Sequence, residues 1–151
     1  MLVDREQLLT PLAGQLFNAN DTAAEVGSSE YDLMAAGHNP AVGEPIGAYF
    51  MLVGSDVNNV TSLTFEIVAS DDAAGSNVTS LVSKTVLLAS LTEASGVQKI
   101  GILNTGAIGS TYQYLLAKVT TNGTPATTGL IRIWLKKSDT DAYPHNAANK
   151  L

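Results

Sequence analysis

Apolar and polar residues alternate with a period of two along most of the chain. Every second residue is apolar in 62–70, and the same pattern recurs in 97–104 and 129–137. This period places successive side chains on opposite faces, so it predicts β-strands that bury one face. The continuous apolar run 46–54 predicts a strand covered on both sides. Weaker patterns predict three further strands: 29–35, 79–89 and 112–121.

Turn-forming residues separate these runs. Clusters rich in Gly, Asn, Ser and Pro lie between the predicted strands, where they supply positive φ or end strand pairing. Asn122-Gly123 is the strongest hairpin signal. It predicts that the strand ending near Thr121 pairs with the strand beginning near Gly129 through a loop of about five residues.

The count of runs predicts the fold class. About eight short strands without a long helix predict an all-β protein, a jelly-roll-like β-sandwich. We expect one domain over residues 1–151. Residues 1–17 have apolar residues at helical spacing, but Pro11 and Gly14 interrupt them. We interpret this segment as an extended N-terminal arm or first strand, and residues 139–151 as a polar C-terminal tail.

Charge is distributed unevenly along the chain. The net charge of −6 argues against a nucleic-acid partner, because binding phosphates needs clustered Lys and Arg. Residues 1–72 hold 11 acidic residues and one basic residue, whereas residues 73–151 hold 7 basic and 3 acidic residues. We expect the two halves to interleave in one domain, so that the difference vanishes in space. The alternative is complementary charge between neighbouring copies or on a partner shell.

The chain offers little chemistry. It has no cysteine, and its two histidines, His38 and His145, lie in separate polar segments without a metal-ligand partner. Asp71-Asp72 and the pair Asp139/Asp141 lack the pattern of an EF-hand loop, so we interpret them as solvated turn acids. We therefore expect no enzyme activity, no cofactor and no metal. We also expect neither a signal peptide nor a membrane span.

Trp134 suggests an interface. It alternates with the apolar residues of its strand and shares a face with Arg132 and Lys136, so it points away from the core. Two interpretations carry equal weight: an exposed interface anchor, and packing beneath the C-terminal tail against Tyr143. Stacking on a sugar is a third, weaker alternative. The apolar part of the arm is the second candidate surface. The candidate interface residues are Leu8, Leu9, Leu12, Leu16, Phe17, Arg132, Trp134, Lys136 and Tyr143.

The whole chain resembles the short jelly-roll cement (stabilisation or decoration) proteins of tailed bacteriophages. The resemblance rests on the N-terminal MLVDREQLL, the strand SSEYDLMAAG, the block from EPIGAYFMLV to KTVLLASL, the pair TYQYLLAKVTTNGTPATTGLIRIWL, and DAYP. It implies a homotrimer on the outside of the expanded head that bridges subunits of the major capsid protein. It also implies a virion location after synthesis in the host cytoplasm. No catalytic or cofactor residue comes with the resemblance.

Two other functions stay open at this stage. One is a tail-associated or receptor-binding β-sandwich that binds carbohydrate through Trp134 or the tyrosines. The other is a jelly-roll enzyme of the cupin type, which would need a cluster of His and Glu ligands. For the cement protein, we further expect the apolar arm, too short and too interrupted to fold alone, to become ordered only on a neighbouring copy.

Overall fold

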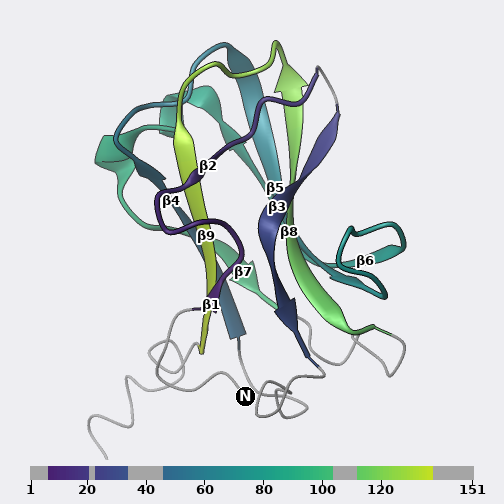
Figure 1. The fold of residues 1–151 in the computed structure, drawn as a ribbon. Coiled ribbons are helices and arrows are strands. Elements are labelled where there is room, and N and C mark those ends of the chain that lie inside the picture. The colour runs from purple at the N-terminus through teal and green to yellow at the C-terminus, as the bar shows by residue number, and fades with distance from the viewer. Residues whose placement is uncertain (1–6, 21–22, 34–45, 104–111, 138–151) are drawn as a thin grey trace, which may run out of the picture.

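The computed structural model describes residues 7–20, 23–33, 46–103 and 112–137. In these ranges the chain forms β-strands and two short 3-10 helices, and no α-helix (Figure 1). No helix in the described ranges is long and apolar enough to cross a membrane. The elements are β1 (Gln7–Leu8), β2 (Gln15–Leu16), β3 (Ala24–Asp32), β4 (Ile46–Val53), β5 (Val60–Ser70), β6 (Val78–Leu87), η1 (Leu88–Ser90), η2 (Glu93–Ser95), β7 (Gln98–Ile102), β8 (Tyr114–Gly123) and β9 (Leu130–Lys137).

Two antiparallel sheets pack face to face and confirm the predicted β-sandwich. Sheet A has the order β1-β9-β4-β7, with β2 also paired to β9, and sheet B has the order β3-β8-β5-β6. Strands β1 and β2 pair with successive parts of β9, so they are two pieces of one edge strand. Counted in this way, the described strands occupy eight positions. The chain changes sheet at every connection except β1–β2 and the β5–β6 hairpin, which is a jelly-roll order.

One predicted pairing is wrong. Strands β8 and β9 do not form a hairpin, because β8 lies between β3 and β5 in sheet B and β9 lies in sheet A. The turn chemistry itself is present: Gly123 has φ +93° and Gly129 has φ +102°. These glycines let the chain reverse direction, but they do not determine which sheet receives the next strand. The connection crosses from one sheet to the other.

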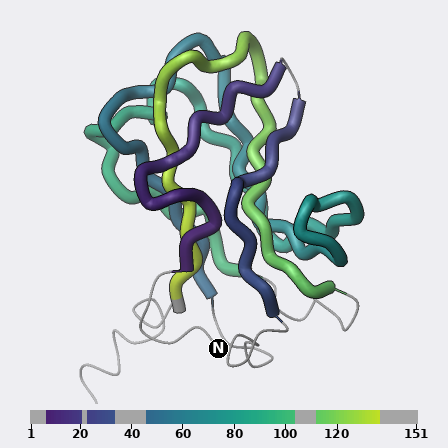
Figure 2. Tube along the Cα trace, viewed as in Figure 1, coloured from purple at the N-terminus to yellow at the C-terminus, as the bar shows by residue number. Residues whose placement is uncertain are grey.

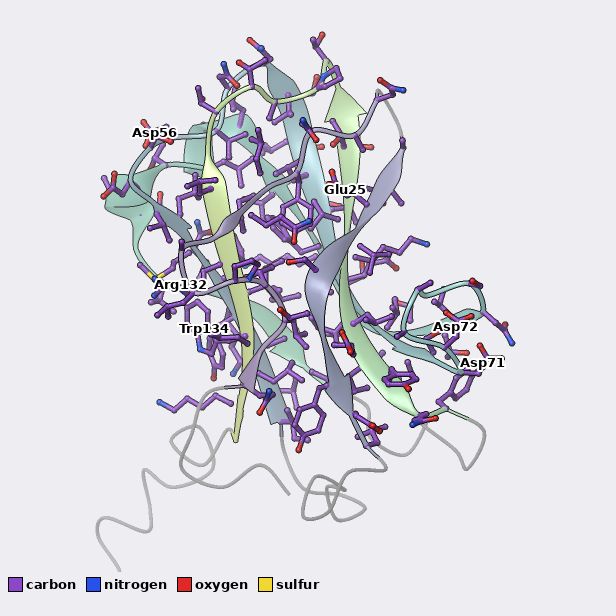
Figure 3. All side chains as sticks on the ribbon, viewed as in Figure 1. Glu25, Asp56, Asp71, Asp72, Arg132 and Trp134 are labelled. Atoms are coloured by element: carbon purple, nitrogen blue, oxygen red, sulfur yellow. The ribbon has the colours of Figure 1, made fainter. Side chains whose placement is uncertain are left out.

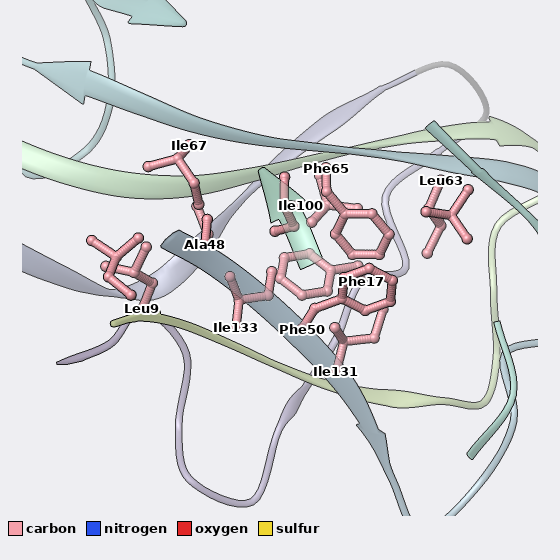
Figure 4. Packing of buried hydrophobic residues seen from close by; sticks show 14 of the residues in the cluster. Leu9, Phe17, Ala48, Phe50, Leu63, Phe65, Ile67, Ile100, Ile131 and Ile133 are labelled. Atoms are coloured by element: carbon pink, nitrogen blue, oxygen red, sulfur yellow. The ribbon is translucent and has the colours of Figure 1, made fainter. Parts of the chain in front are cut away.

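The core lies between the sheets and follows the alternation seen in the sequence. Inward rows from β4, β5 and β9 are fully buried, and the rings of Phe50 and Phe65 stack across the sheets with centroids 4.1 Å apart (Figure 4). Offset stacking of this kind adds to the stabilisation from burial of the rings. The two sheets are therefore joined through aromatic as well as aliphatic contacts.

The N-terminal segment is part of its own sandwich. Leu9 and Phe17 are 0% and 1% exposed and belong to the core cluster (Figure 4). The Leu9 amide donates to the Ile133 carbonyl, and the Ile133 amide donates to the Thr10 hydroxyl at 3.0 Å. The hypothesis that this segment orders only on a neighbouring copy is therefore wrong, and the interpretation as a first strand holds.

Pro11 and Gly14 form a turn at the place where they interrupt the helical spacing. The Gly14 amide donates to the Pro11 carbonyl, and Gly14 has φ +86°. These residues form a turn that leaves the sheet after β1 and returns to it at β2. The apolar residues on either side thus reach the core from two short strand pieces, without a helix.

Candidate functional site

The candidate residues of β9 lie on the outer face of sheet A. Ile131, Ile133 and Leu135 point into the core, so the residues between them point outward. The outward residues of β9 pair in register with those of β4, and Figure 3 shows Arg132 and Trp134 along this side of the sandwich. The cross-strand pairs are Gly47–Lys136, Tyr49–Trp134, Met51–Arg132 and Val53–Leu130.

Trp134 is not exposed, so the interpretation of it as an exposed interface anchor is wrong. It is 4% exposed, and its ring stacks with the ring of Tyr49 at a centroid distance of 6.0 Å and an interplanar angle of 22°. Leu8 of β1 is its register partner on the other side. Alternation predicts the face on which a side chain lies, but it does not predict what covers that face. A covered indole is also unsuited to stacking on a sugar.

Gly47 makes room for this aromatic pair. A Cβ at Gly47 would lie 2.6 Å from the Tyr49 hydroxyl oxygen and 2.7 Å from a ring carbon. Such distances are far inside van der Waals contact. The absent side chain therefore allows the Tyr49 ring to lie across β4, close to Trp134.

Arg132 is held in a fixed position. Its Nε donates to the Leu12 carbonyl at 2.7 Å, and its Nη1 lies 3.9 Å from the Met51 sulfur. The first contact joins β9 to the turn between β1 and β2, and the second joins β9 to β4. The guanidinium is thus half-buried and oriented before any partner arrives.

Apolar residues lie beside Arg132 on the turn that it contacts and on the neighbouring strands. Leu12 is 65% exposed and Leu130 is 40% exposed, and other apolar side chains beside them are partly exposed. Contiguous exposed apolar surface often marks an interaction site, and Met and Arg are enriched in interface cores. The set, here named the sheet A patch, consists of Leu12, Leu16, Met51, Val53, Leu130 and Arg132.

The structure divides the predicted interface residues into groups. Leu12, Leu16 and Arg132 belong to the sheet A patch, and Lys136 is exposed on the same face. Leu9 and Phe17 are in the core, so neither is available to a partner. Leu8 is partly buried opposite Trp134, and Tyr143 lies outside the described residues.

Sequence reasoning missed Met51, Val53 and Leu130. Met51 and Val53 belong to a continuous apolar run, which predicts burial on both faces, and Leu130 precedes the alternating residues of its strand. Only the register between β4 and β9 places them around Arg132. That register joins residues about 80 positions apart, so no local pattern could have shown it.

The edge of the sandwich beside the patch is closed by the N-terminal segment. The Gln15 amide nitrogen donates to the Val26 carbonyl at 3.2 Å, and its oxygen accepts from the Ser28 amide at 2.8 Å. The Gln15 side chain thus satisfies one carbonyl and one amide of β3 that would otherwise be open to a neighbouring strand. Figure 2 shows this segment crossing between β9 and β3. The free edge of β3 is thus partly occupied, which disfavours pairing with another chain.

The opposite edge is protected by a lysine. Lys84 of β6 is in register with the inward residue Phe65, so it lies on the core-facing row of an edge strand. Its Nζ donates to the Lys99 carbonyl of β7 at 3.0 Å. An inward-pointing lysine on an edge strand opposes the addition of a further strand. Partners are therefore expected to bind through faces or loops.

Loops at one end of the sandwich form a hydrogen-bonded network. The Asn58 side-chain oxygen accepts from the amides of Thr127 and Thr128, and the Asp56 carboxylate accepts from the Glu93 amide at 2.7 Å (Figure 3). These contacts join the β4–β5, β8–β9 and η2 segments. The acid and the amide at this end are thus used to hold the loops together.

The carboxylates of Asp71 and Asp72 accept hydrogen bonds within the β5–β6 loop. Asp72 accepts from the Ser76 amide at 3.1 Å, and Asp71 accepts from the Asn77 side chain at 3.2 Å. The Ser76 backbone hydrogen bond is the main cause that lowers the pKa of Asp72 below its ordinary value. No group of three or more potential metal-ligating side chains lies together in the described residues. His38 and His145 lie outside them.

Comparisons with known proteins add no family. No protein-family model matches this chain. No curated protein matches it in sequence either. The fold and the sheet A patch, together with the sequence resemblance stated above, are the observations that bear on function.

Proposed function

We propose that this protein is a structural component of a phage virion that binds the outside of the head and stabilises it. It acts as a homotrimer, and each copy bridges subunits of the major capsid protein. The observation that carries this proposal is the sheet A patch, a partly exposed apolar surface beside a fixed arginine, on a sandwich whose edges are partly occupied by its own side chains.

The patch supports a binding role because exposed leucines are unfavourable without a partner. Leu12 and Leu130 lose contact with water when a protein surface covers them, and each buried CH₂ contributes about 0.8 kcal/mol. Closed edges direct partners away from strand addition and toward this face. A shell protein gains from such contacts because many modest interfaces on one particle act together.

The capsid as the partner rests on the sequence resemblance, and the jelly-roll strand order is consistent with it. The carbohydrate-binding alternative relied on Trp134 or the tyrosines, and the indole of Trp134 is covered. Copy number separates the two roles, since a shell protein is abundant and a tail protein is not.

The first test is the copy number of this chain in purified virions relative to the major capsid protein, measured by quantitative mass spectrometry. A ratio near one supports the proposal, because it distributes the protein over the whole shell. A few copies per particle would assign it to the tail or a vertex, and its absence from virions would overturn a structural role.

The trimer is tested separately by light scattering on the purified protein. The expected mass is three times the 15.7 kDa of one chain. A monomeric mass in solution together with a monomeric footprint on the head would contradict the trimer.

A further inference from the structure

Charge is segregated between the two sheets. The strands of sheet A contain no Asp or Glu and four basic residues, whereas those of sheet B contain four acidic and two basic residues. Both halves of the sequence contribute strands to both sheets, as expected, yet the charged residues of the described strands are divided unequally between the two sheets. The basic residues of sheet A are Lys99, Arg132, Lys136 and Lys137; the acidic residues of sheet B are Glu25, Glu30, Asp32 and Glu66.

The two sheets also differ in how their outward charges are compensated. On sheet B, Lys118 of β8 lies directly opposite Glu66 of β5 in register. Cross-strand pairs of opposite charge are favourable. On sheet A, the contacts of Arg132 within the described residues are a carbonyl oxygen and a thioether sulfur, both uncharged. Arg132 is thus half-buried, and none of the carboxylates in the described ranges forms an ion pair with its guanidinium.

We infer that the sheet A patch docks on a protein surface that places a carboxylate opposite Arg132 and apolar side chains opposite Leu12 and Leu130. This inference rests on the proposed function, so that surface belongs to the capsid shell. With Nε bound to the Leu12 carbonyl and one Nη1 hydrogen donated toward the Met51 sulfur, the remaining N–H groups of Nη1 and Nη2 are left for the partner. A guanidinium binds a carboxylate through two parallel hydrogen bonds, and such charge-assisted bonds are strong in a desolvated interface.

A second copy of this chain is a poorer occupant of the patch. A two-fold contact of the patch with itself would bring two Arg132 side chains together, and like charges repel. A contact between the outer face of sheet A and the outer face of sheet B of another copy would join opposite sides of the sandwich (Figure 1). Stacking of opposite faces in this way adds copies in one direction and builds an open stack. If the patch docks on the capsid shell, the trimer contact lies on other surfaces.

The experiment measures binding of the full-length protein to purified expanded heads that lack it. Arg132→Glu is compared with Lys118→Glu, which makes the same charge change on the other sheet. Leu12→Ser is compared with Leu87→Ser, because both leucines are 65% exposed and Leu87 lies on β6. Arg132→Gln removes the charge but keeps a hydrogen-bond donor, so it guards against loss of the contact with Leu12. Circular dichroism checks that each variant is folded.

We expect Arg132→Glu, Arg132→Gln and Leu12→Ser to weaken binding by about tenfold or more, as for interface hot spots. The two sheet B variants should stay within about twofold of wild type, as for residues outside an interface. Wild-type binding should weaken with added salt, and this dependence should be smaller for Arg132→Gln.

Each outcome has a distinct meaning. If the wild-type protein does not bind the heads, the proposed function fails, and the inference fails with it. Binding by wild type with equal binding by all five variants overturns the inference and leaves the proposed function standing. Loss of the trimer in Arg132→Glu and Arg132→Gln, measured by light scattering, would show that a second copy occupies the patch and would also overturn the inference.

Discussion

Outward-pointing aliphatic side chains are buried on the central strands of sheet B but exposed or partly exposed in the sheet A patch. On sheet B, Val68 and Leu116 point outward and pair in register, yet they are 1% and 0% exposed. The β5–β6 loop covers this row, since a Cβ at Gly75 would lie 3.2 Å from a Leu116 methyl group. On sheet A, Leu130 points outward and is 40% exposed. One face is covered by its own chain, and the other retains exposed apolar surface.

The polar residues of the two faces support the same contrast. On sheet B, the Thr64 and Thr85 hydroxyls are 2.9 Å apart, and the Asn122 amide donates to both Ser62 and Thr64. These groups satisfy one another across three strands. The described outer face of sheet A has aromatic, aliphatic and basic side chains in the corresponding rows. A face whose polar groups are already paired has less to gain from a partner.

The largest predicted effect compares Leu116→Ala with Leu130→Ala. Leu116 is fully buried beneath the loop, so its truncation should lower the free energy of unfolding by about 2–5 kcal/mol. Leu130 is partly exposed, and its truncation should change stability by less than about 1 kcal/mol. Urea denaturation of both variants measures the difference. Equal losses would mean that sheet A is covered as thoroughly as sheet B.

A smaller effect is predicted for Gly47→Ala. The new methyl group overlaps the Tyr49 ring, so the ring must move away from Trp134, at a cost of about 1–3 kcal/mol. Trp134 is the single tryptophan of the chain, so its fluorescence reports on this place alone. We expect a red shift of the emission as water reaches the indole. Unchanged emission with unchanged stability would show that Tyr49 does not cover the tryptophan.

The smallest predicted effect is on the pH dependence of stability, and it comes from Asp72 in the β5–β6 loop. The pKa of Asp72 is lowered in the folded protein, chiefly by the Ser76 amide. The ionised carboxylate therefore stabilises the folded state above the ordinary pKa of 3.8, and this contribution is lost as pH falls through the lower, folded value. Asp72→Asn should thus reduce stability slightly at pH 7 and not in strong acid. A difference between the two proteins that grows toward low pH would contradict this sign.

The strands were predictable because alternation is a local property. The predicted run 62–70 corresponds to β5, and 129–137 corresponds to β9, within two residues at either end. The β8–β9 hairpin was not predictable, because Asn122-Gly123 specifies a turn and not a partner. The burial of Trp134 depends on Tyr49 and on the missing side chain of Gly47, which come from a strand more than 80 residues earlier.

The same limit applies to the candidate site. Arg132 was identified because it shares a face with Trp134, and Leu12 because the N-terminal segment is apolar. That these two side chains belong to one patch depends on a hydrogen bond between residues 120 positions apart. The burial of Leu9 and Phe17 also depends on contacts between distant parts of the sequence, because β1 and β2 pair with β9, the last described strand.

The pairing of the first strand with the last has a consequence for the order in which the molecule folds. Thr10 accepts a hydrogen bond from Ile133, across 123 residues of chain. During synthesis, sheet B can assemble once β8 has left the ribosome, but sheet A lacks its central strand until β9 follows. Contacts of such long range also make folding slow. A nascent or truncated chain that lacks β9 therefore cannot present the sheet A patch.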